Sequence, residues 1–110
     1  MAKNKKKYLL DIITAIEGIQ NDHLDGIHSL DDFLKNNTAQ KAVERELGII
    51  GEAIYQANKI DKNLSITRKD YFINFRNTII HQYADVSVKR IWQIVHYDLP
   101  SLKSEVLGIL

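Results

Sequence analysis

Four side chains that could bind phosphate or move a proton fall within eight residues of this chain. They are Arg76, Asn77, His81 and Tyr83. On a helix, Asn77 would lie next to His81 four residues later, and Arg76 and Tyr83, seven residues apart, would share a face. Histidine titrates near neutral pH and can both accept and donate a proton. Arginine is a permanent forked cation that matches the oxygens of a phosphate.

The residue types in this segment suit one reaction in particular. No cluster of aspartate, glutamate or cysteine accompanies them, so we expect neither a metal nor another cofactor. Histidine and arginine without a metal suit cleavage of RNA, where a base removes the proton of the 2′-hydroxyl and a cation stabilises charge building on phosphorus. We therefore expect Arg76 and His81 to be catalytic, with Asn77 orienting them.

Each of these residues also has a purely structural alternative. Arg76 could form a surface ion pair, His81 could cap the C-terminus of its helix, and the ring of Tyr83 could pack against the protein. The other histidines, His23, His28 and His96, lack the spacing of metal ligands, and we expect them at the surface or at an interface.

The elements that must position these residues are predicted to be helices. Apolar residues recur at steps of three and four, and nothing alternates with period two for long enough to form a strand. The expected helices cover, in order, residues 7–20, 24–35 in two pieces, 38–57, 67–83 and 88–109. The fold class is therefore all-α, an antiparallel bundle of four main helices plus a short fifth.

Local signals mark where the helices begin and bend. Ser29 and Thr67 are candidate N-caps. So is one of Asn36, Asn37 and Thr38 for the long helix, and either Asp85 or Ser87 for the last segment. Pro100 lies inside that segment, where it predicts a kink or restart near residues 98–99.

Two glycines sit in the middle of the longest predicted helix. Gly48 and Gly51 each cost about 1 kcal/mol there relative to alanine, so we expect another helix to approach closely. Ile49, Ala53 and Trp92 lie off the main apolar seams, which fits a dimer interface or a broad core.

Composition places these helices in one domain, residues 1–110, with residues 1–6 as a flexible basic end. The chain is 45% hydrophobic and 26% charged, with no cysteine and a formal net charge of +1. This balance is typical of a folded chain and excludes disulfides and thiolate zinc sites. No apolar run is long enough to span a membrane, and no signal peptide follows the basic start, so we expect a cytoplasmic protein without a membrane partner.

The pattern Arg-x4-His-x-Tyr formed by Arg76, His81 and Tyr83 resembles the HEPN superfamily, specifically the HepT-like toxins of HEPN/MNT toxin–antitoxin modules. Residues 42–53 resemble the central helix of that family, and residues 91–100 resemble its last helix. The three blocks occur in the family's order. The resemblance spans about residues 8–107.

The resemblance implies a homodimer in which two Arg-x4-His motifs meet in one cleft. It implies a toxin that acts as a metal-independent endoribonuclease on tRNA or mRNA, with Arg76 and His81 as the catalytic pair and Asn77 as the polar residue beside them. It also implies an MNT-type nucleotidyltransferase as antitoxin partner, which in some such pairs transfers AMP to the tyrosine at the position of Tyr83.

Two alternatives remain open on the sequence. The motif could bind nucleotide or RNA without cleaving it, so that the protein serves mainly as partner and substrate of the nucleotidyltransferase. The chain could also be a helical scaffold with no toxin role.

Overall fold

The computed structural model describes residues 4–81 and 87–110, and all the regular structure in these two ranges is helical. The prediction of an all-α fold is therefore confirmed. In chain order the elements are α1 Lys5–Glu17, the π-helical turn η1 Gly18–His23, α2 Leu30–Leu34, α3 Asn37–Ile60, α4 Lys69–His81, α5 Val88–Gln93, the π-helical turn η2 Ile94–Asp98, and α6 Leu99–Ile109.

Three of the residues named as candidate N-caps are observed at the start of a helix. The Asn36 side chain accepts a hydrogen bond from the Ala39 amide at 2.9 Å, and Ser29 Oγ accepts one from Asp32 at 3.1 Å. The Ser87 side chain caps α5. Each cap satisfies an amide that the first turn of a helix leaves without a partner.

Thr67 does not cap α4, contrary to the prediction. The helix begins at Lys69, and the Thr67 hydroxyl donates instead to Glu105 of α6 at 2.5 Å. The Thr67 amide donates to the same carboxylate at 3.1 Å. A tertiary partner with two acceptor oxygens has replaced the local cap, which the sequence around Thr67 could not reveal.

The first helix starts earlier than predicted. Lys5 and Lys6 form its first turn, so the expected flexible end is not correct for these two residues, and residues 1–3 lie outside the described part. Asn4 caps the turn through the Lys6 amide. Lys5 Nζ donates to Asp61 at 3.0 Å, and this hydrogen bond lowers the pKa of the Asp61 carboxyl.

The C-terminal segment breaks where Pro100 predicts. The wide turn η2 ends at Asp98, and α6 begins at Leu99 with Pro100 in its first turn. The backbone stays helical through Asp98 and Leu99, and the π-helical turn shifts the hydrogen-bond register just before the proline, whose nitrogen cannot donate. The predicted restart near residues 98–99 is confirmed.

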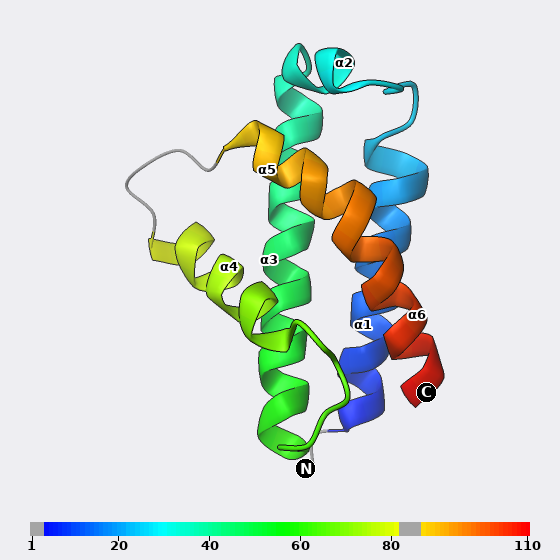
Figure 1. Ribbon diagram of the computed structural model, residues 1–110, viewed down its shortest axis with the longest axis vertical. Coiled ribbons are helices and arrows are strands. Elements are labelled where there is room, and N and C mark those ends of the chain that lie inside the picture. The colour runs from blue at the N-terminus through cyan, green and yellow to red at the C-terminus, as the bar shows by residue number, and fades with distance from the viewer. Residues whose placement is uncertain (1–3, 82–86) are drawn as a thin grey trace.

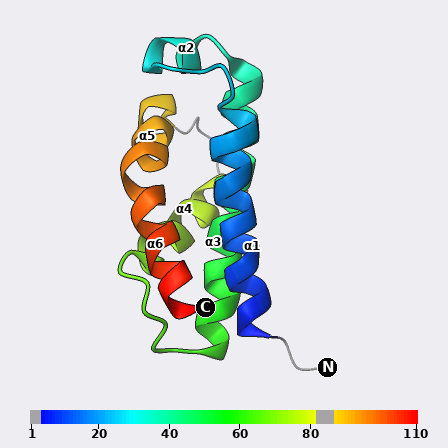
Figure 2. The ribbon, with the colours of Figure 1, turned by 90° about the vertical axis from the view of Figure 1, so that its right-hand side faces the viewer.

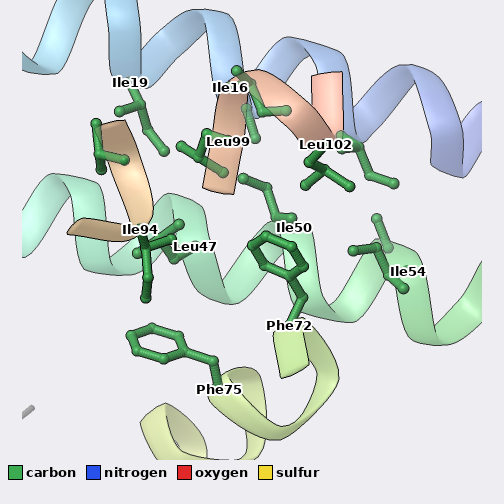
Figure 3. Close-up of a cluster of buried hydrophobic side chains, with 14 of the residues drawn as sticks. Ile16, Ile19, Leu47, Ile50, Ile54, Phe72, Phe75, Ile94, Leu99 and Leu102 are labelled. Atoms are coloured by element: carbon green, nitrogen blue, oxygen red, sulfur yellow. The ribbon is translucent and has the colours of Figure 1, made fainter. Parts of the chain in front are cut away.

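The helices pack as an antiparallel bundle around one core. Figure 1 shows α1 and α3 running in opposite directions side by side, with α4 on one side of α3 and the α5–η2–α6 segment crossing the pair. Figure 2 shows this segment to the left of α1 and α3, as a separate layer. Side chains from every long element converge between them (Figure 3); the labelled core includes Ile16, Ile19, Leu47, Ile50, Ile54, Phe72, Phe75, Ile94, Leu99 and Leu102.

Of the apolar residues predicted to lie off the seams, Ala53 is buried in this core. Trp92 packs against the core while half-buried, and Ile49 is 38% exposed. In the part of the chain that the structure describes, no helix is both long and apolar enough to cross a bilayer.

Candidate active site

The motif residues lie on the second half of α4, which packs along α3. Phe72 and Phe75 of α4 are 2% and 8% exposed and face the core, and these contacts fix the rotation of the helix. Arg76, next in sequence, is thereby placed against α3. His81 is the last residue of α4. Five residues of helical rise separate its backbone from that of Arg76, about 7.5 Å along the axis.

Gly51 allows α4 to approach α3 this closely. A Cβ at this position would lie 2.5 Å from the carbonyl oxygen of Phe72 and would also overlap Cβ of Arg76. Both contacts are too short for real atoms, so only glycine fits without a shift of one helix. The close approach predicted for Gly51 is confirmed, and it brings the stem of Arg76 directly onto the backbone of α3.

Two oxygen atoms hold the Arg76 guanidinium. Nη2 lies 2.5 Å from Glu52 Oε1, and Nη1 donates to Asn77 Oδ1 at 2.6 Å. The guanidinium carbon also lies 5.2 Å from the ring centroid of Tyr55, within the range of a cation–π contact. Nε is buried and has no hydrogen-bond partner among the described residues. The side chain is therefore fixed in place while part of its donor capacity is unused.

A groove of about 510 Å³ opens beside Arg76. Its walls come from α1, the outer face of α3 and α4, and its lining residues are Tyr8, Asp11, Lys41, Glu44, Arg45, Gly48, Ile49, Glu52, Ala53 and Arg76. Three of these residues are cations, Lys41, Arg45 and Arg76, and three are carboxylates, Asp11, Glu44 and Glu52. Arg76 is the one of the three cations that is half withdrawn from solvent.

The remaining predicted site residues are only partly placed. Tyr83 lies outside the described residues, and for His81 the structure describes the backbone at the end of α4. Asn77 is adjacent to Arg76 and binds it.

The other three histidines lie apart from this groove. His23 is 3.7 Å from Glu46, the His96 ring contacts that of Trp92 at a tilt of 56°, and His28 is exposed. In the described ranges, no three His, Asp or Glu side chains gather in the geometry of a metal site.

Two contacts of Arg76 were not assigned from sequence. The sequence links neither Glu52 nor Tyr55 to Arg76. A signal exists for both, because Gly48, Glu52 and Tyr55 repeat at helical steps of four and three along the same face of α3 as the groove. The residue that they meet on α4 could not be inferred, because it depends on how the two helices cross.

Comparison with known proteins gives consistent matches over the whole fold. The family model described as "Ribonuclease HepT-like" matches residues 9–109. A protein of Thermococcus cleftensis named "Probable ribonuclease HepT" is 36% identical over 107 residues, which cover 96% of this chain and 94% of that protein.

A second relative, from Methanocaldococcus jannaschii, is longer. It is named "Gamma-glutamylcyclotransferase and putative RNase" and is 36% identical over 118 residues, covering all of this chain. The present chain spans 49% of that protein's length. No solved structure matches this chain.

Proposed function

This chain belongs to the HepT-like ribonuclease family, and we propose that it is a toxin that cleaves tRNA or mRNA without a metal ion. The observation that carries the proposal is the placement of Arg76. Its guanidinium is fixed at the edge of a groove and lies on the same helix as His81, one and a half turns earlier. A fixed forked cation on the same helix as a residue that can exchange protons supports phosphodiester cleavage as the reaction.

In the proposed reaction, His81 removes the proton of a 2′-hydroxyl. The 2′-oxygen attacks the adjacent phosphorus, and the bond from phosphorus to the 5′-oxygen of the next nucleotide breaks. That oxygen takes a proton from a second His81, on the partner subunit of a homodimer. Arg76 binds the nonbridging oxygens and stabilises their developing charge. The products are a 2′,3′-cyclic phosphate and a free 5′-hydroxyl.

The homodimer in this proposal places two such grooves against each other. Ile49 supports it, because this apolar side chain lines the groove and is 38% exposed. Apolar surface beside a functional groove is typical of a protein interface. The proposal places the protein in the cytoplasm, where an MNT-type nucleotidyltransferase neutralises it, in part by transferring AMP to Tyr83.

The test uses the purified, unmodified chain on total tRNA and on a messenger RNA in excess EDTA, beside His81→Ala. We expect fragments with 2′,3′-cyclic phosphate ends from the wild type and none from the variant. His28→Ala is the matched control, since His28 is exposed and lies outside the groove, and it should cleave like the wild type.

Two results would contradict the proposal. Cleavage that stops on addition of EDTA would place a metal in the reaction. Absence of cleavage by a verified dimer would favour a module that binds RNA or nucleotide without cutting it, with Tyr83 as its functional residue.

A further inference from the structure

A second groove, about 660 Å³ in volume, lies on a different surface of the bundle. Five of its lining residues come from α5 and η2 and recur at helical steps. We call them the α5–η2 stripe: Lys89, Trp92, Gln93, His96 and Tyr97. Leu30 of α2 forms the opposite wall. None of these residues lines the groove that holds Arg76.

Tilted ring contacts connect the stripe to the core. The Trp92 ring lies 5.3 Å from that of buried Phe33, tilted by 37°. On its other side the His96 ring lies 4.0 Å from Trp92. Tyr97 follows His96 and is 75% exposed. Phe33 thus anchors Trp92, while His96 and Tyr97 are exposed rings that line the groove.

One cation, Lys89, lies in the stripe at its N-terminal end and is exposed in the first turn of α5. Arg90, the next residue, is also exposed, but its guanidinium lies over the ring of Tyr71 of α4, 5.3 Å from the centroid. Asp31 and Asp32 lie in the first turn of α2, after Leu30, and do not line the groove. The positive side of the groove is therefore α5.

The stripe is also continuous in the chain with the motif helix. Ser87, the N-cap of α5, comes six residues after His81. Figure 1 shows that α4 ends and α5 begins on the same side of the bundle. A ligand chain bound along α5 could therefore extend toward the end of α4.

We infer that the α5–η2 stripe binds single-stranded RNA, an assignment that rests on the proposed ribonuclease function and gives it a surface for holding the substrate. Exposed rings stack on bases of any sequence, and lysine and arginine bind the phosphates between them. The Gln93 amide can donate to and accept from a base edge. An exposed lysine in the same stripe favours RNA over a protein partner, because the centres of protein interfaces are depleted in lysine.

The test uses Trp92, the only tryptophan in the chain. The probe is a 12-nucleotide oligouridylate in which every sugar is 2′-O-methylated, so that the proposed reaction cannot cleave it. We expect saturable quenching of Trp92 fluorescence. Tyr97→Ala should weaken binding about tenfold, whereas Tyr97→Phe keeps the ring and should bind like the wild type. Leu107→Ala, at a residue that is 52% exposed on α6, is the matched control and should change nothing.

A second measurement examines the phosphate contact. For single strands, each neutralised phosphate contributes about −0.7 to the slope of log K against log salt. Lys89→Ala should therefore reduce the magnitude of that slope by about this amount. An unchanged slope would show that Lys89 does not contact a phosphate of the bound RNA.

Because the probe cannot be cleaved, the result is independent of the proposed reaction. If the wild type cleaves RNA but Tyr97→Ala changes neither the Kd for the probe nor the KM for long RNA, the inference is overturned and the ribonuclease stands. If the probe binds through Tyr97 in a chain that cleaves nothing, the surface stands and the ribonuclease does not. Quenching by a purified nucleotidyltransferase, with none by RNA, would also overturn the inference.

Discussion

Arg76 combines a fixed stem with a guanidinium that two different acceptors hold. Glu52 binds one terminal nitrogen and Asn77 the other, which orients the planar fork. Lysine at this position would keep the charge but lose the two-point geometry. We predict that Arg76→Lys lowers kcat for RNA cleavage by about 100-fold, the scale of losing one oriented donor to a developing anion.

The control for this change is Arg68→Lys, at the residue that directly precedes the same helix. Arg68 binds Asp98 at 2.6 Å and lies outside the groove of Arg76. It should retain near wild-type kcat. If Arg76→Lys has the same kcat as the control, Arg76 does not stabilise the transition state of the reaction.

Glu52 competes with phosphate for the same guanidinium. Its side chain is 41% exposed, so the pair is accessible to an anion and its net stabilisation is at most about 1 kcal/mol. Glu52→Gln keeps an oxygen acceptor and removes the negative charge. We expect KM for RNA to fall by about threefold to fivefold with kcat little changed, whereas Glu17→Gln on the exposed face of α1 should change neither. A raised KM would show that the charge of Glu52 assists binding.

At the scale of elements, the contact of α3 with α4 depends on the absence of a side chain at Gly51. Alanine has the higher helix propensity, yet its Cβ would overlap the backbone of α4 at Phe72. Overpacking of this kind costs about 1–3 kcal/mol. We predict that Gly51→Ala lowers the free energy of unfolding by that amount, measured by urea denaturation.

Gly108→Ala provides the matched comparison, because nothing lies within 4 Å of a Cβ built there on α6. It should raise stability by up to about 1 kcal/mol through helix propensity alone. Equal effects of the two substitutions would show that α3 and α4 do not meet at Gly51.

Sequence predicts those elements whose causes are local. Caps such as Asn36 and the break at Pro100 follow from chemistry within a few residues, and the close approach at Gly51 follows from a costly glycine. Thr67 was misassigned because its partner, Glu105, lies 38 residues away. The same distinction applies to the candidate site. The residues of the motif can be identified from the sequence, whereas the contact of Glu52 with Arg76 cannot, because it depends on how α3 and α4 cross.

At the scale of the whole molecule, the proposed reaction needs two chains. A homodimer would have a mass of about 25 kDa, twice the 12.7 kDa of one chain. We predict that sedimentation gives this mass and that Ile49→Asp reduces it to that of a monomer, because a carboxylate would be buried without a partner at the interface.

Leu107→Asp, also at an exposed apolar residue but away from the groove, should leave the dimer intact. Loss of the dimer in this variant, with Ile49→Asp still dimeric, would place the interface on another face. The two motifs would then not share a cleft.

The most direct measurement of the central claim is made on the substrate. In an RNA that the chain cleaves in EDTA, the 2′-hydroxyl at the cleavage site is replaced by a 2′-O-methyl group, and cleavage at that bond is followed. The proposed chemistry predicts complete loss of cleavage there, with binding retained, because the attacking oxygen is blocked. Cleavage that continues at the methylated position would show that water attacks the phosphorus, and it would contradict the roles proposed for Arg76 and His81.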